Sequence, residues 1–270
     1  MPTDQTALAS ELLDLICELG ADLAGFARIE DLRYGPSEML FPAMKDHCLD
    51  RYAAQVTTGL PFGAVKWEAY EQTLLVFALR HSEEEPQLDW WFGEADPPGN
   101  RILADIARRF RETLSKTHPE ICVNPHPYPI EKGGVYLKDA AVAAGLGCIG
   151  RSNLLITPQY GPRIRLRAIG LSIPLAPTGP IDFDPCAACA SPCRSACPRS
   201  AFSEQIYTHE ETGLAALPGR DGSYYRLACN HEMDENVQSA PLESVPEIAP
   251  QPIPVIRYCR ACELACPVGK

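Results

Sequence analysis

The chain has 270 residues, 46% of them hydrophobic, and a net charge of −11, so it can build one large domain or two moderate ones around a substantial core. The negative charge argues against a basic-patch mode of nucleic-acid binding. No apolar run approaches the roughly 18 residues of a membrane span, and the first ten residues lack the features of a secretion signal. We therefore expect a cytoplasmic protein without a membrane partner, in which twelve Cys favour metal binding over disulfides.

The first part of the chain predicts a mixed α/β domain. Apolar residues at helical spacing predict a first helix over 6–20, in which Cys17 is expected to be buried. Helices are also predicted over 100–115 and 135–144. Apolar runs of strand length predict strands at 21–27, 73–79, 122–123, 154–157 and 164–170.

The run at 73–79 is continuously apolar, which suits a central strand covered on both faces. The polar and acidic segment 81–85 follows it directly. We expect this segment to be a solvated loop and assign it no function.

Two segments of the second part are rich in cysteine, and each ends in Cys-Pro. The first reads Cys-Ala-Ala-Cys-Ala-Ser-Pro-Cys-Arg-Ser-Ala-Cys-Pro at 186–198, and the second reads Cys-Arg-Ala-Cys-Glu-Leu-Ala-Cys-Pro at 259–267. This is the ligand pattern of ferredoxin-type [4Fe–4S] clusters, in which the last Cys of one run binds the other cluster. The pairing predicts that one cluster is held by Cys186, Cys189, Cys193 and Cys266.

The second cluster would take Cys197, Cys259 and Cys262, and Cys229 is the best candidate for its fourth ligand. The count then closes at eight Cys for two clusters, which would form an electron relay. Zinc is the alternative, because Cys-x2-Cys pairs also occur in zinc sites built from four cysteines. The three residues between Cys189 and Cys193 depart from the usual spacing, and we expect a bulge at Ser191-Pro192.

A glycine-rich run follows the helix predicted over 135–144. Gly145, Gly147 and Gly150 permit tight turning and a close approach of the backbone to a ligand. The run does not match the dinucleotide-binding fingerprint, because its glycines follow a helix and do not link a strand to one.

The run Ala-Gly-Leu-Gly-Cys-Ile-Gly-Arg-Ser-Asn-Leu-Leu-Ile-Thr-Pro-Gln-Tyr-Gly-Pro-Arg-Ile-Arg-Leu at 144–166, followed by the two cysteine motifs, resembles the epoxyqueuosine reductase and reductive dehalogenase superfamily. The resemblance implies an α/β (α+β) chain with two modules. Residues 1–175 would form a nitroreductase-like, cobalamin-binding sandwich, and residues 176–270 would form a ferredoxin-like module with two [4Fe–4S] clusters. The cobalt of the cobalamin would take electrons from the nearer cluster.

The resemblance also implies roles for single residues. The corrin or its tail would be bordered by Gly145, Gly147, Arg151, Asn153, Tyr160 and Gly161, with Asn230 and His231 approaching from the cluster side. Glu131 stands near the place of the Asp that donates a proton in epoxyqueuosine reductases, although a solvated loop carboxylate is an equal alternative. Tyr136 is a second candidate donor, because reductive dehalogenases use a Tyr; packing at the helix start is its alternative role.

We therefore expect an oxidoreductase that passes electrons through two [4Fe–4S] clusters to cobalamin and acts on a small-molecule substrate. Its electrons would come from a redox partner such as a ferredoxin or flavodoxin. A different class of protein is also open: an electron carrier, or a protein that reduces and hands over a corrinoid without a substrate of its own. Epoxyqueuosine reduction itself is a third, weaker hypothesis, since the acidic charge argues against tRNA as a partner.

Overall fold

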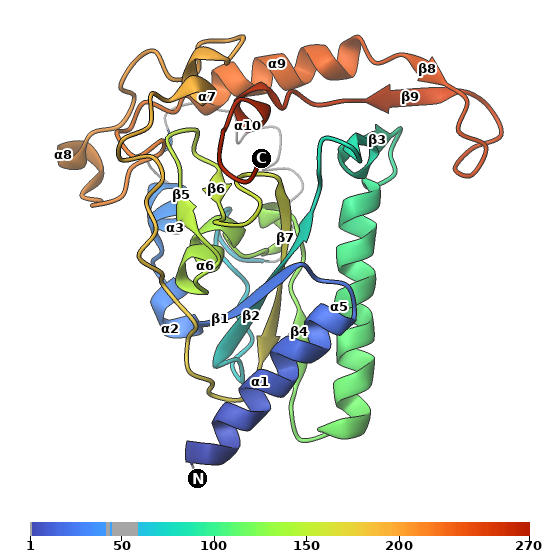
Figure 1. Ribbon diagram of the computed structural model, residues 1–270, viewed down its shortest axis with the longest axis vertical. Coiled ribbons are helices and arrows are strands. Elements are labelled where there is room, and N and C mark those ends of the chain that lie inside the picture. Colours follow the sequence, from blue (N-terminus) through green and yellow to red (C-terminus); the bar gives the residue numbers. More distant parts are fainter. Residues whose placement is uncertain (1, 42–43, 45–58) are drawn as a thin grey trace.

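A four-stranded antiparallel sheet forms the centre of the computed structural model, which describes residues 2–41, 44 and 59–270 (Figure 1). Its strands lie in the order β1-β2-β7-β4. The two long central strands pair from Thr73 opposite Leu171 to Arg80 opposite Ile164. The strands are β1 (Leu23–Arg28), β2 (Thr73–Arg80), β7 (Ile164–Leu171) and β4 (Val123–Pro125).

Both faces of this sheet are covered, as the continuous apolar run in β2 predicted. Successive side chains of a strand point to opposite faces. Leu75 and Phe77 therefore belong to one buried core with Phe110, whereas Leu74 and Val76 belong to a second core. The first core is closed by α1 (Pro2–Glu18) and α5 (Pro98–Thr117), and the second by α2 (Ile29–Leu32) and α6 (Leu137–Ala143).

Two expectations about this domain were wrong. Cys17 is exposed, because Leu12 and Ile16 supply the buried face of α1 and Cys17 lies one position further round the helix. His81 is only 4% exposed, although the expectation was a solvated loop. It is buried because it directly follows β2 and lies under the C-terminal part of the chain.

The C-terminal part lies across one end of the sheet in Figure 1 and consists mainly of loops and short helices. Strand β9 pairs on one side with β8 and on the other with β3, which comes from the α/β part. The two parts are therefore joined by a common small sheet. The elements are α7 (Pro192–Ser195), α8 (His209–Thr212), α9 (Arg226–Gln238), β8 (Leu242–Glu243), β9 (Ile253–Ile256), α10 (Ala261–Leu264) and β3 (Trp91–Phe92).

Short elements complete the chain between these parts. Strands β5 and β6 pair with each other in the glycine-rich region. None of the helices in the described residues has the length and apolar character needed to cross a membrane. The remaining elements are α3 (Pro36–Leu40), η3 (Pro86–Asp89), η4 (Ile130–Lys132), β5 (Cys148–Ile149) and β6 (Leu155–Ile156).

Candidate functional site

Four thiols that are distant in sequence surround one small internal cavity. Cys186, Cys189, Cys193 and Cys266 line this cavity together. Helix α7 carries Cys193, and Cys266 follows shortly after the end of α10. The two helices pack against each other and so bring the two cysteine segments together. We call these residues the first cysteine group.

Neighbouring thiols of the first cysteine group raise one another's pKa. Burial raises the pKa of Cys193, and the neighbouring thiols of Cys266, Cys186 and Cys189 raise it further, because like charges disfavour the thiolate. The same two effects, burial and nearby thiols, raise the pKa of Cys266. Four thiolates at such spacing are stable only with a compensating cation between them, which fits an iron–sulfur cluster or a metal ion.

A second cysteine group consists of Cys197, Cys229, Cys259 and Cys262. Burial raises the pKa of Cys262 to about 12, and Cys229, Cys259 and Cys197 add to the effect as nearby like charges. Burial also raises the pKa of Cys259, with contributions from Cys229 and Cys197. The four thiols therefore lie close together, although Cys229 comes from α9 and belongs to neither motif.

Local backbone geometry explains how the first motif accommodates its extra residue. Ser191 has a left-handed backbone with φ of 59° and precedes Pro192, the first residue of α7. Its backbone N–H donates to Cys189 Sγ at 3.4 Å. A comparable N–H of Ala201 donates to Cys197 Sγ at 3.4 Å. Such donors favour thiolates and tune the potentials of cysteine-bound clusters.

A cavity of about 1800 Å³ lies between the α/β part and the C-terminal part. It is larger than the 300–1000 Å³ usual for small-molecule sites, so it has room for a large cofactor. Its wall is aromatic and charged. Among the lining residues are Trp90, Trp91, Tyr224, Tyr258, His81, Glu131, Tyr136, Lys138, Asn153, Arg226, Asn230 and Arg257.

The second cysteine group lies beside this cavity. Lys138 lines the cavity and donates from Nζ to the carbonyl oxygen of Asn153 at 2.6 Å. Burial and the charge of Arg226 lower the pKa of Lys138 to about 8, while Asp139 and Cys229 act in the opposite direction. Since Cys229 also affects the pKa of Tyr224, another lining residue, this cysteine lies close to the cavity wall.

Both predicted proton donors line the large cavity. Glu131 lies in η4. Tyr136 lies just before α6 and donates from its hydroxyl to the carbonyl oxygen of Gly63 at 2.8 Å. Burial raises the pKa of Tyr136, and the carboxylates of Glu38 and Asp139 raise it further, so the phenol stays protonated at neutral pH. Proton donation by either residue remains a prediction.

The predicted corrin-binding residues fall into two sets. Asn153 and Asn230 line the large cavity. The others have protein neighbours: a Cβ on Gly145 or Gly147 would meet the backbone of Thr178 or Ile156. Contact of either set with a corrin remains a prediction.

The rest of that second set lies near the first cysteine group or on the surface. Arg151 donates to the carbonyl oxygen of Cys189 at 3.1 Å and to Ser191 Oγ at 2.9 Å. Tyr160 and Gly161 pack against the C-terminal loop at Gly269 and Val268. His231 is exposed. Arg151, Tyr160 and Gly161 therefore support the cysteine loops more directly than the cavity.

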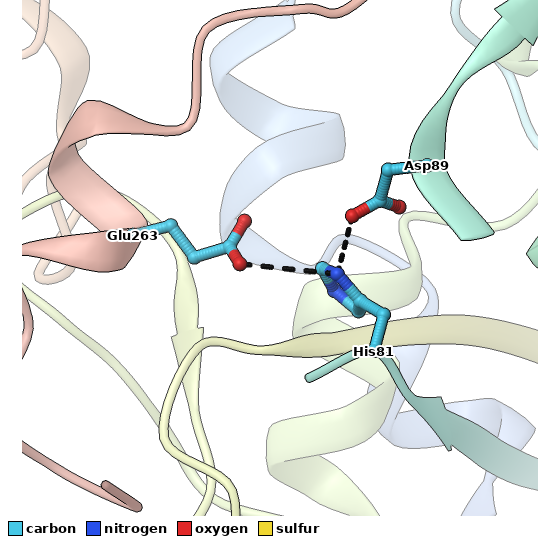
Figure 2. Close-up of side chains that lie close together, drawn as sticks. All are labelled: His81, Asp89 and Glu263. Atoms are coloured by element: carbon cyan, nitrogen blue, oxygen red, sulfur yellow. Dashed lines mark ion pairs between the residues drawn. The ribbon is translucent and has the colours of Figure 1, made fainter. Parts of the chain in front are cut away.

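Sequence reasoning missed a buried charged network on the cavity wall. Figure 2 shows His81 directed at Asp89 and Glu263, which come from η3 and α10. Arg165 and Arg260 both contact the Asp89 carboxylate. The available signal was a histidine close to the end of a continuously apolar strand.

His81, Asp89 and Glu263 bring three potential ligand atoms within 4.8 Å of one another, which is a spacing that suits a metal ion. The two guanidinium groups argue against this assignment. Arg260 lies 2.9 Å from His81 Nδ1 and 3.3 Å from Asp89 Oδ2, so a cation already occupies the position facing these atoms. Two arginines also balance the two carboxylates, and a divalent ion would add uncompensated buried charge.

Comparison with known proteins gives partial sequence matches and a match over nearly the whole fold. No family model matches the chain. The tetrachloroethene reductive dehalogenase of Sulfurospirillum multivorans is 41% identical over 83 residues, which are 30% of this chain and 16% of that protein. The corresponding enzyme of Desulfitobacterium hafniense is 43% identical over 68 residues, 24% of this chain and 12% of that protein.

The solved structures of two epoxyqueuosine reductases share the fold. One, labelled with selenomethionine, has a TM-score of 0.63 at 15% identity and covers 98% of this chain and 66% of its own. The enzyme of Streptococcus thermophilus has a TM-score of 0.62 at 19% identity and covers 96% of this chain and 65% of its own. The chain thus spans less than two thirds of each relative named here. The sequence matches and the shared fold relate this chain to the superfamily of epoxyqueuosine reductases and reductive dehalogenases, as its sequence predicted.

Proposed function

We propose that the chain is an iron–sulfur, corrinoid-dependent reductase. In this proposal residues 1–175 form a nitroreductase-like corrinoid-binding module and residues 176–270 carry two [4Fe–4S] clusters. The observation that carries the proposal is the presence of two four-thiol groups, the second of which lies, through Cys229, close to Lys138 and Tyr224 in the wall of a cavity of about 1800 Å³.

The two cysteine groups would hold one cluster each. Support comes from the coupled pKa values of the thiols and from backbone N–H groups that donate to Cys189 and Cys197. The interleaved pairing, in which Cys266 joins the first group and Cys197 the second, matches ferredoxin-type ligation. Zinc stays the alternative, and iron and sulfide analysis distinguishes the two.

The second group would be the one that delivers electrons to the cavity. Cys229 influences Lys138 and Tyr224, both of which line the cavity. The first group would receive electrons from an external carrier such as a ferredoxin or flavodoxin. This order assigns the relay a direction from the first group to the second.

A corrinoid in the cavity would supply a cobalt centre that carries single electrons to a substrate. The chain's own contribution would be to bind and orient the ligands of the cavity. Asn153 and Asn230 present polar groups at the wall, and the aromatic residues Trp90 and Trp91 exclude water. Glu131 or Tyr136 would hold the proton that a reduction consumes.

The decisive experiment is anaerobic reconstitution with iron and sulfide, followed by EPR and by titration with cob(II)alamin. We expect two cluster signals and saturable binding with a change in the cobalt spectrum. Ala216→Trp places a bulky side chain on an exposed part of the cavity rim and is expected to weaken this binding. Ala7→Trp, on the exposed face of α1, is the matched control.

Clusters without any corrinoid binding would leave the second candidate function, an electron carrier. The observation against that candidate is the set of ionisable side chains on the cavity wall, because a carrier has no need of proton donors there. Epoxyqueuosine reduction is tested separately by restoration of queuosine in cells that lack the usual enzyme. We expect no restoration, because the net charge of −11 opposes tRNA binding.

A further inference from the structure

We propose that His81 is a redox-linked proton site, which takes up a proton when a neighbouring cysteine-bound cluster gains an electron. The inference rests on the clusters of the proposed function, and it adds a proton-binding residue that neither the sequence motifs nor the resemblance supplies. His81 lines the large cavity, so the proton would be held at the wall where the proposed reduction takes place.

The His81 imidazole is held at its Nδ1 edge. Its backbone N–H donates to the carbonyl oxygen of Arg163 at 3.1 Å, and its residue is 4% exposed. Nδ1 faces the Asp89 carboxylate, which is 12% exposed in its side chain (Figure 2). The contacts to Asp89 and Arg260 both involve Nδ1, so Nε2 is the ring nitrogen outside these two contacts.

His81 contacts the second cysteine motif, residues 259–267, which supplies ligands to both proposed clusters. Arg260 and Glu263 occupy positions immediately after Cys259 and Cys262. Arg260 contacts His81 Nδ1 at 2.9 Å and donates to the His81 carbonyl oxygen at 3.3 Å. Glu263 Oε1 lies 3.8 Å from Nδ1. The two side chains that contact the His81 imidazole thus each belong to the residue next to a proposed cluster ligand.

The other groups near His81 are charged side chains from several elements. Arg165 and Arg260 stay protonated, because guanidinium groups do not titrate in proteins. Burial alone would raise the pKa of Asp89, but His81, Arg165 and Arg260 outweigh it and lower this pKa. Glu263 pairs with Arg260 at 2.5 Å, and Glu83 faces the same arginine from the loop after His81.

The formal charges of Asp89 and Glu263, the two carboxylates next to His81, are equal and opposite to those of the two arginines, and Glu83 adds a further negative charge near Arg260. Histidine is in general the side chain that changes charge between about pH 5 and 8. An electron on the neighbouring cluster lowers the local potential and makes the imidazolium more stable. In balance, the cluster gains one electron from a one-electron reductant such as a reduced viologen, and His81 gains one proton from water.

The test is a redox titration of the reconstituted protein, with viologen mediators and EPR detection, at several values between about pH 5 and 8. We expect one of the two midpoint potentials to fall with rising pH. The limiting slope is about 59 mV per pH unit, because one pH unit is a tenfold change in proton concentration and one proton is taken up per electron. His81→Asn is expected to abolish this slope, because its amide still donates to Asp89 but does not titrate.

His118→Gln is the matched control, since this histidine lies near Glu11 and Glu120, away from the cysteine groups, and its loss should leave the slope unchanged. His81→Gln provides a second replacement if His81→Asn does not take up iron. Two pH-independent potentials in the wild type, or a slope that survives replacement of His81, would overturn the inference. Absence of cluster EPR signals in the wild type would instead reject the proposed function itself.

Discussion

Arg163 donates a hydrogen bond from its guanidinium to the carbonyl oxygen of Cys266, the last cysteine of the second motif, at 3.4 Å. The same guanidinium donates to the carbonyl oxygens of Glu263, at 3.3 Å, and Val268. Arg163 is 4% exposed and precedes β7, so a buried arginine of the α/β part holds the loop that contributes the final thiol of the first cysteine group.

Replacing Arg163 tests this link. Arg163→Ala leaves three carbonyl groups without their donor, and a buried unsatisfied polar group costs about 1–3 kcal/mol. We expect the first cysteine group to lose its cluster preferentially, seen as loss of one of two EPR signals and a lower iron content. Arg108→Ala, an exposed arginine of α5, is the control and should keep both signals. Equal loss of both signals would show that Arg163 supports the whole C-terminal part.

The assignment of Cys229 to the second cysteine group predicts a selective loss of one cluster. Cys229→Ala should abolish the cluster signal of the second group and leave that of the first, because its thiol influences Cys259 and Cys262. Iron analysis and EPR of the reconstituted variant measure this. Cys122→Ala, which replaces an exposed thiol, should retain both clusters. A Cys229→Ala protein with two unchanged signals would exclude Cys229 as a ligand.

A buried Glu–His pair predicts a dependence of stability on acid. Glu71 Oε1 lies 3.0 Å from His126 Nε2, and both side chains are almost completely buried. Burial would raise the pKa of Glu71, but His126, Asn124 and the backbone of Glu68 outweigh it and lower this pKa. The carboxylate therefore contributes stability above the ordinary value of 4.5, and this contribution is lost as the pH falls through the lowered pKa.

Glu71→Gln should lower the free energy of unfolding at pH 7 by about 1–3 kcal/mol. The difference between variant and wild type should shrink as the pH falls below 4.5. Urea unfolding across the acid range measures both quantities. Glu112→Gln, on the exposed face of α5, serves as the surface control and should show little difference at any pH. A constant difference between Glu71→Gln and the wild type would mean that packing, and not charge, causes the loss.

Lys138 predicts that the stability of the protein rises with pH in the alkaline range. Its pKa is lowered from 10.5 to about 8, so the folded protein disfavours the ammonium. The stability should therefore rise between about pH 8 and 10.5, where the unfolded chain binds more protons. At about 1.4 kcal/mol per pKa unit, Lys138→Met should stabilise the protein at pH 7 by at most about 3 kcal/mol.

Unfolding by urea at pH 7 and pH 10 compares Lys138→Met with Lys66→Met, a replacement at an exposed position. The gain should be large at pH 7 and much smaller at pH 10 for Lys138→Met, and small at both values for Lys66→Met. A loss of stability at pH 7 would indicate that the charge of the second cysteine group stabilises the ammonium in the native protein.

Gly145 separates a packing role from a corrin-binding role. Its φ is +75°, and a Cβ there would lie 2.8 Å from the carbonyl oxygen of Thr178. Gly145→Ala should therefore destabilise the protein by more than Gly213→Ala, whose φ is +67° but which has open space around it. Thermal unfolding measures the difference. Unchanged stability with weaker cob(II)alamin binding would point instead to a direct contact with the corrin.

The strands and helices of the α/β part were predictable because their apolar patterns are local. The run at 73–79 predicted a strand covered on both faces, and β2 lies at the centre of the sheet between two cores. Cys17 shows the limit of this reasoning. Its neighbours Leu12 and Ile16 complete the buried face of α1, so the next position points to solvent.

The amino-acid sequence by itself determined which cysteines are available and how they are spaced, because spacing within a short motif is a property of the residue order alone. Only the tertiary structure brought Cys229 to Cys259 and Cys262, and Arg260 and Glu263 to His81. These contacts join residues from separate elements. Their distances depend on how the C-terminal part packs on the sheet, and no local pattern encodes that packing.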